Sequence, residues 1–185
     1  MSKIDVLAAR YERHIAVPWQ RTLAGAQRVL IVVYPQDAER ALRARQEEFA
    51  QRTRDADHGW VEYDCTEAFA RWMAADEYRE AYFEEPDALA MKLETEFLEA
   101  VSEPLRNLLR QKDDQTVVAV TGVASLYGFT RVSQLVGAVE SDIRGRLVVF
   151  FPGTKDGNNY RLLDARDGWN YLANSITSHS AGVDS

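Results

Sequence analysis

The residues that come closest to a phosphate-binding site are two glycines followed by a threonine and an arginine. Gly122, Gly128, Thr130 and Arg131 lie in "TGVASLYGFTRVS" (121–133), after an apolar run and before a segment with helical periodicity. In a phosphate loop the glycines let backbone N–H groups surround the phosphates, a lysine neutralises charge and a hydroxyl holds magnesium. The chemistry that this order of residues could support is nucleotide binding.

Three departures weaken that interpretation. The two glycines are separated by five residues rather than four, and Phe129 stands where the lysine is needed. No lysine lies between Lys112 and Lys155. The later apolar run "RLVVFFPG" lacks the terminal aspartate that would hold magnesium. We therefore expect no catalytic hydrolysis of nucleoside triphosphates, and we keep open weak nucleotide binding without turnover at the loop Gly122–Thr130.

No other group of residues has the spacing of a catalytic or metal site. The single cysteine, Cys65, excludes an internal disulfide and is expected to be a small buried residue at the end of a strand. The three histidines are scattered without ligand spacing. Asp164 and Asp167 bracket Arg166, which favours a local ion pair or a cap over catalysis. We expect no enzyme activity, no cofactor and no metal.

The net charge of −7 is unevenly distributed. Residues 1–60 sum to +2, residues 61–115 to −9 and residues 116–185 to zero. An acidic middle disfavours direct binding of nucleic acid. It could dock a basic protein partner, or it could simply be a solvated set of helices. No apolar run approaches the length of a membrane span and the start has no signal-peptide pattern, so we expect a cytoplasmic protein.

The elements that would position the loop alternate between strands and helices. This alternation predicts an α/β fold with a mainly parallel sheet of about five strands flanked by helices, similar to a degenerate P-loop or Rossmann-like domain without a Walker motif. The expected domain spans residues 1–176, and residues 177–185 read as a disordered tail. Sites in such sheets lie beyond the carboxyl ends of the strands. The expected strands are "RVLIVVY", "WVEYDC", "TVVAV", "RLVVFF" and "YRLLD".

Several element boundaries follow from local signals. Ser2 predicts the cap of the first helix, and Asp64 with Glu67 predicts a capping box for a helix after the second strand. Pro104 predicts the start of a new helical segment rather than the interior of an existing one. Pro152-Gly153 predicts the end of the fourth strand.

The sequence also resembles a known family. The stretches that carry the resemblance are "YERHIAVPWQRTLAGAQRVLIVVY", "VTGVASLYGFTRVSQLV" and "IRGRLVVFFPGTKDGNNYRLLDARDGWNYL". They look like the BrxB family, a component of bacteriophage exclusion (BREX) systems, over about residues 3–176. The resemblance implies a cytoplasmic bacterial or archaeal protein that acts with other BREX proteins, among them an adenine-specific DNA methyltransferase, a large ATPase and the alkaline-phosphatase-like PglZ. It implies PglZ as the direct partner and brings no catalytic residues.

Two functional hypotheses follow. The first is a non-catalytic scaffold of a BREX complex, whose contact surface uses aromatic or arginine residues near the strand ends, since such residues anchor interfaces. The second is a nucleotide-responsive or weakly catalytic domain that uses the loop Gly122–Thr130. A core-packing role stays open for each expected contact residue: Tyr127, Phe129, Arg131, Tyr160, Arg161 and Trp169.

Overall fold

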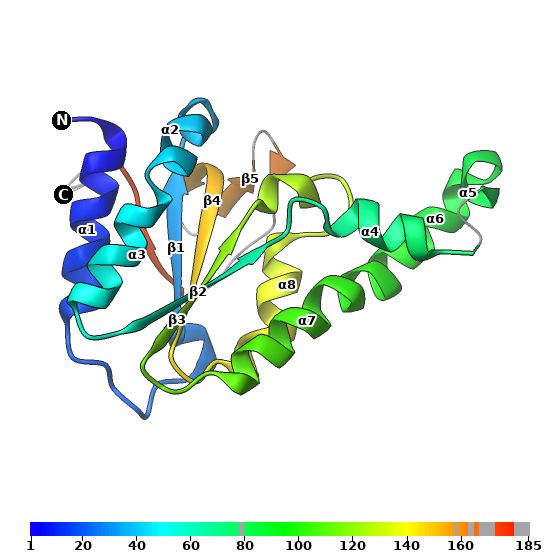
Figure 1. Cartoon of the computed structure of the whole chain (residues 1–185). Coiled ribbons are helices and arrows are strands. Elements are labelled where there is room, and N and C mark those ends of the chain that lie inside the picture. Colours follow the sequence, from blue (N-terminus) through cyan, green and yellow to red (C-terminus); the bar gives the residue numbers. More distant parts are fainter. Residues whose placement is uncertain (78–79, 158, 163–164, 167–172, 180–185) are drawn as a thin grey trace.

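A computed structural model describes residues 1–77, 80–157, 159–162, 165–166 and 173–179 of the chain. A central sheet is covered by helices on both faces, and a row of helices extends away from one side of the sheet (Figure 1). The α/β fold with a mostly parallel sheet, predicted from the alternation of strands and helices, is confirmed.

Five strands form the parallel part of the sheet in the order β2-β3-β4-β1-β7, and every neighbouring pair in this order is parallel. A hairpin extends β4, because β5 pairs with it antiparallel and β6 pairs with β5. The bounds are β1 Val29–Tyr34, β2 Gly59–Asp64, β3 Thr116–Thr121, β4 Arg146–Asp156, β5 Asn159–Leu162, β6 Ala165–Arg166 and β7 Asn174–Ile176.

The first face of the sheet is covered by three helices that come early in the chain. They are α1 (Lys3–Ala16), α2 (Glu39–Ala44) and α3 (Gln46–Asp55). Their inward side chains, among them Tyr11 and Phe49, pack with the apolar side chains of β1, β3 and β4. The predicted cap of the first helix is confirmed, since the hydroxyl of Ser2 accepts the backbone N–H of Asp5 at 3.2 Å.

The second face is covered by α7 (Leu98–Gln111) and α8 (Val132–Val139). Their apolar stripes bury against β1, β3 and β4 in the larger of the two cores. Every residue of β1 is buried, as expected for a strand covered on both faces.

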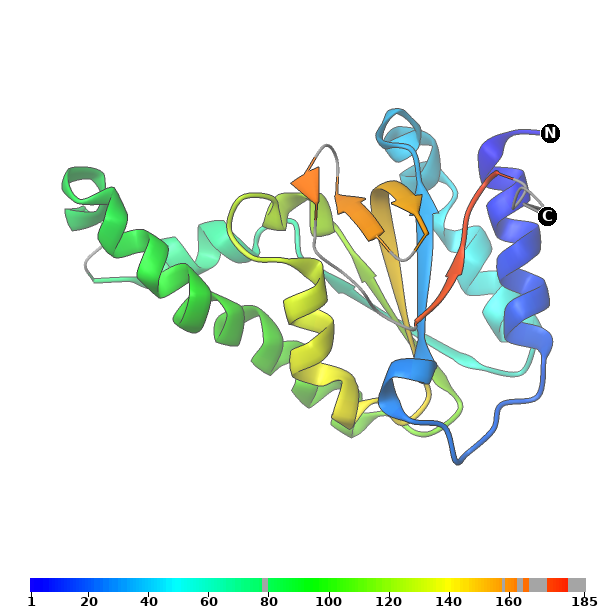
Figure 2. The same ribbon diagram turned by 180° about the vertical axis from the view of Figure 1, so that it is seen from behind.

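The helices that extend away from the sheet form what we call the acidic arm. It comprises α4 (Ala68–Ala75), α5 (Ala81–Glu84), α6 (Pro86–Lys92) and a π-helical segment (Leu93–Phe97) that continues into α7. Both views show α5 and α6 far from the sheet (Figures 1 and 2). Within the part of the chain that the structure describes, no helix is long and apolar enough to cross a membrane.

Two of the predicted boundaries at prolines are wrong. Pro104 lies inside α7 rather than at the start of a new segment. The buried stripe Val101, Leu105 and Leu109 runs through this position, so packing outweighs the backbone hydrogen bond that proline cannot donate. Strand β4 also continues through Pro152, where it leaves its parallel partner β1 and begins to pair with β5.

The predicted capping box of Asp64 and Glu67 is also wrong. Helix α4 begins at Ala68, and no side chain caps it. The Asp64 carboxylate instead accepts the backbone N–H and the hydroxyl of Thr66, at 2.9 and 2.5 Å. Such a local bond to the residue two positions on is a turn that competes with the helical cap. This turn lies directly beside the loop in question.

Candidate functional site

The carboxyl edge of the sheet is where a ligand of an open α/β fold is expected. A cavity of about 320 Å³ lies there, between the ends of β1, β2 and β3 and the helices α2 and α3. The residues that define its character are Tyr34, Glu39, Arg43, Glu47, Glu62 and Asp64, and Gly122 lies at its border.

This cavity is acidic. Four carboxylates line it, those of Glu39, Glu47, Glu62 and Asp64, against one guanidinium, that of Arg43. The Nε of Arg43 donates to Glu39 at 2.7 Å, and the hydroxyl of Tyr34 donates to the same carboxylate. Burial, reinforced by the hydrogen bond to Glu39, raises the pKa of Tyr34, so its hydroxyl stays protonated. A surplus of negative charge repels a phosphate group.

Gly122 is packed against the turn that follows β2. Its φ is +70°, and a Cβ at this position would lie 2.4 Å from the Oγ1 of Thr66 and 2.5 Å from the Oδ1 of Asp64. Partial burial acts to raise the pKa of Asp64, but the hydrogen bonds from Thr66 outweigh it and keep the pKa below its usual value. An ionised carboxylate thus lies against the first glycine of the loop. The glycine allows two loops to meet closely and leaves no space for a phosphate beside it.

Several backbone donors of the loop are already used. Four N–H groups donate to carbonyls within the loop itself, at 2.9 to 3.1 Å: those of Ser125, Tyr127, Phe129 and Thr130. A phosphate loop must point such groups at its ligand. This loop therefore has the place of a phosphate loop in the fold, but four of its N–H groups point at its own carbonyls rather than at a ligand.

The aromatic residues of the loop divide between core and surface. The ring of Phe129 stacks on that of Phe69 in α4, with centroids 3.8 Å apart and planes 5° apart. Tyr127 is 45% exposed. Arg131 is exposed directly before α8, and its backbone N–H donates to the Oε1 of Gln134 at 3.3 Å. The structure therefore brings Tyr127 and Arg131 to one exposed edge, while Phe129 attaches the loop to the arm.

The other expected contact residues come from the later part of the chain. Tyr160 is 1% exposed and packs edge-on against Phe151 at 5.7 Å, so it is a core residue and not an exposed anchor. Arg161 is exposed on β5. Trp169 lies outside the described residues, as do the acids Asp164 and Asp167 and the segment 180–185 of the expected tail.

Other chemistry finds no support at the described positions. Cys65 is buried, and burial raises the pKa of its thiol to about 12, so it is protonated at neutral pH. Low-pKa, accessible thiols are the reactive ones. Among the residues that the structure describes, no three His, Cys, Asp or Glu side chains are grouped as a metal site requires.

Sequence reasoning identified the place of the acidic cavity but missed residues that give it its charge. Sites were expected beyond the carboxyl ends of the strands, but Glu39, Arg43 and Glu47 were not singled out. The spacing of four residues between Glu39 and Arg43 was an available signal, because it places them on one face of a helix, whereas Glu47 comes from the next helix, α3.

Comparison with known proteins agrees with the resemblance found in the sequence. The family model for the BREX protein BrxB matches residues 66–176, which is more than half of the chain. A search of curated proteins found no match, and neither did a search of solved structures. The matched stretch includes the loop, the arm, α7, α8 and β4. The chain belongs to the BrxB family of BREX phage-defence systems.

Proposed function

We propose that this protein is a non-catalytic scaffold subunit of a cytoplasmic BREX complex and that it binds PglZ. Membership of the BrxB family supports a role within a system of several subunits. The choice of PglZ rests on what the family resemblance implies. The absence of catalysis is proposed from the chemistry of the carboxyl edge.

The observation that carries the proposal is the closed loop after β3. Four of its N–H groups donate internally, and its first glycine is packed against the Asp64 carboxylate. The loop after β3 is therefore packed against protein on the side of Gly122, and the cavity beside it at the carboxyl edge is lined by carboxylates. The same loop leaves Tyr127 and Arg131 exposed, and Tyr and Arg are the residue types that most often anchor protein interfaces.

The loop is also rigid enough to act as a contact surface. Phe129 stacks on Phe69 and lies edge-on to Phe97 at 6.2 Å, which ties the loop to both ends of the arm. A contact that is already ordered loses less conformational entropy on association.

The acidic arm adds long-range electrostatics to this surface. Residues 68–97, which span the arm, carry eight acidic and three basic residues, a net −5. Helices of such charge attract a basic partner and raise the association rate at low salt. We propose that the partner presents a basic surface to the arm and a pocket to Tyr127.

The proposal is tested by co-purification of the tagged chain with PglZ at moderate salt. The wild-type chain is expected to retain PglZ, and Arg131→Glu, Arg161→Glu or Tyr127→Ala to weaken binding by roughly tenfold, the scale of a hot-spot residue. Arg40→Glu is the matched control, because Arg40 is exposed on α2, which covers the other face of the sheet. If the wild-type chain retains no PglZ, the proposal is wrong.

A nucleotide-responsive domain that uses the loop Gly122–Thr130 is the alternative. The acidic cavity and the occupied N–H groups argue against it. This alternative predicts either that the chain hydrolyses ATP or that a nucleotide raises its melting temperature and that Arg131→Glu removes this rise. We expect neither effect from this loop.

A further inference from the structure

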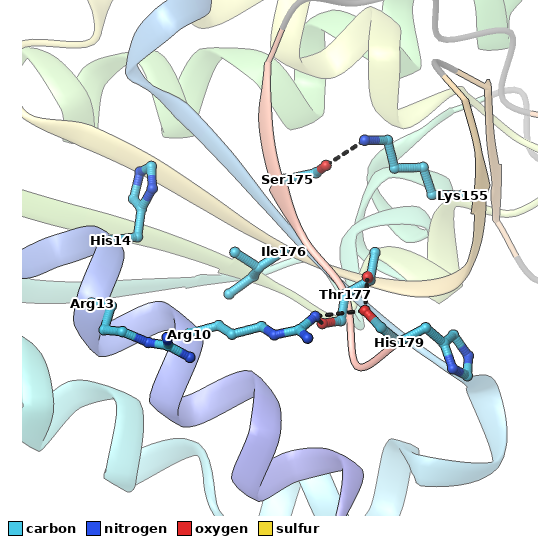
Figure 3. A pocket seen from close by; sticks show the side chains of 8 residues that line it. All are labelled: Arg10, Arg13, His14, Lys155, Ser175, Ile176, Thr177 and His179. Carbon is cyan, nitrogen blue, oxygen red and sulfur yellow. Dashed lines mark hydrogen bonds between the residues drawn. The ribbon is translucent and has the colours of Figure 1, made fainter. Parts of the chain in front are cut away.

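A second cavity of about 540 Å³ lies between helix α1 and the edge strand β7. Helix α1 and β7 run side by side in both views, and Lys155 reaches the cavity from the end of β4 (Figures 1 to 3). The polar and charged residues that line it include Arg10, Arg13, His14, Lys155, Ser175 and Thr177. We call it the basic cavity.

The charge of this cavity contrasts with that of the whole chain. Among the described residues, Arg10, Arg13 and Lys155 line it, and no carboxylate does. None of these three cations takes part in the ion pairs formed between the described residues. Three uncompensated cations around one hollow, in a chain of net charge −7, create a local field that attracts anions.

Two of the cations are held in place by neutral acceptors. The Nη1 of Arg10 donates to the carbonyls of Thr177 and His179, the latter at 2.6 Å (Figure 3). The Nζ of Lys155 donates to the Oγ of Ser175 at 2.6 Å. Carbonyl and hydroxyl groups orient these side chains without cancelling their charge. The arrangement is therefore ordered before a ligand arrives.

Helix electrostatics alone do not account for the cluster. Arg13 lies in the last turn of α1, where a cation interacts favourably with the helix dipole. The helix dipole does not explain the position of Lys155, which comes from β4. Burial, reinforced by the charge of Arg146, lowers the pKa of His14 below 6.5, so His14 is neutral at pH 7 and adds a hydrogen-bonding group rather than charge.

We propose that the basic cavity binds a small phosphate-bearing ligand of nucleotide size. Its volume falls within the range of about 300–1,000 Å³ that is usual for small-molecule sites. Guanidinium groups match phosphate oxygens in charge and geometry, and an ammonium adds a point charge. A long nucleic acid is a poorer fit because the chain is acidic overall. This proposal is independent of PglZ binding.

Titration calorimetry of the full chain tests the proposal, with pyrophosphate, ATP, AMP and uncharged adenosine as probes. ATP binding without pyrophosphate binding would indicate recognition of the nucleoside as well, whereas comparable binding of both would indicate recognition of the phosphates alone. Either result supports the proposal, provided that adenosine does not bind and that affinity falls as salt rises. No binding of any phosphate probe at millimolar concentration overturns it. So does tighter binding of a pentaglutamate peptide, which would make the cavity a site for acidic polypeptide.

Matched double variants locate the site. Arg13→Gln with Lys155→Gln is expected to weaken phosphate binding by about tenfold or more, since each lost charge-assisted hydrogen bond is among the stronger kinds. Lys3→Gln with Arg40→Gln removes the same two charges at exposed positions outside the cavity and is expected to change affinity less than about twofold. Equal losses in the two variants would mean a non-specific charge effect and would overturn the proposal. Unfolding midpoints of both variants check that they fold.

Discussion

The two glycines of the loop provide a matched test of why the loop needs glycine. Both Gly122 and Gly128 have positive φ, +70° and +79°. Alanine at either position should cost about 1–2 kcal/mol of the free energy of unfolding for the left-handed backbone alone. Only Gly122 has neighbours within 4 Å of its missing Cβ. The difference between the two variants therefore isolates the close packing against Asp64 and Thr66.

The size of that difference can be worked out from the contacts. A Cβ on Gly122 would lie 2.4 Å from the hydroxyl of Thr66 and 2.8 Å from its backbone nitrogen, so the turn must move. Overpacking of this kind costs about 1–3 kcal/mol, and each Asp64–Thr66 hydrogen bond that is lost adds about 0.5–1.5 kcal/mol. Gly122→Ala should lose about 3–5 kcal/mol in total, against about 1–2 kcal/mol for Gly128→Ala.

Urea unfolding followed by tryptophan fluorescence measures both variants, since the chain has four tryptophans. Equal losses for the two glycines would refute the close-packing argument. A free energy of unfolding for Gly122→Ala equal to that of the wild-type chain would refute the close-packing argument as well. The loop would then have to be considered again as a ligand site.

Four further outcomes are expected. Phe129→Ala should lose about 2–3 kcal/mol of unfolding free energy in urea, less than a fully buried phenylalanine would, while Tyr127→Ala should lose under about 1 kcal/mol. Gly137→Ala should gain about 0.5–1 kcal/mol in the same assay, because Gly137 is exposed within α8 and its Cβ would meet nothing within 4 Å. Cys65 should react with Ellman's reagent at pH 8 only after unfolding, since burial raises its pKa to about 12. Hydrogen bonds from Ser2 lower the pKa of Asp5 from 3.8 to about 2, so the stabilisation by its ionised carboxylate is present above about pH 4 and is lost as pH falls towards 2. The melting temperature of Asp5→Asn should therefore fall less than that of the wild-type chain between about pH 4 and pH 2.

The fold was predictable because its core strands are unusual in composition. Continuous runs of apolar and β-branched residues, such as 29–34 and 116–121, occur where both faces of a strand are covered. The helical stripe of α8 follows equally from its period. These signals are local, and a single sequence contains them in full.

The errors at the prolines arose where packing across the fold overrode a local rule, and the error at Asp64 arose where one local hydrogen bond replaced another. Pro104 is held inside α7 by a stripe that packs on the sheet, and Pro152 lies where β4 changes partner. Asp64 forms a turn with Thr66 rather than a helix cap, and that turn packs against Gly122. The packing of α7 on the sheet, the change of strand partner at Pro152 and the contact with Gly122 all involve residues far away in the sequence.

The sites were less predictable than the fold for the same reason. Arg10 meets Thr177 across 167 positions of sequence, and Lys155 joins them from a third element. Charge counts along the chain gave residues 1–60 only a slight positive excess, because they average over side chains that face different ways. A cluster formed by folding is not apparent in such sums.

The contrast between the two cavities bears directly on what the loop can do. Two unit charges 4 Å apart interact by about 4 kcal/mol at an effective dielectric constant near 20, so the sign of the lining charge decides where a phosphate lies. Carboxylates line the carboxyl edge beside Gly122, and cations line the hollow beside α1. A phosphate-bearing ligand would thus bind away from Tyr127 and Arg131, and those residues would stay accessible to a protein.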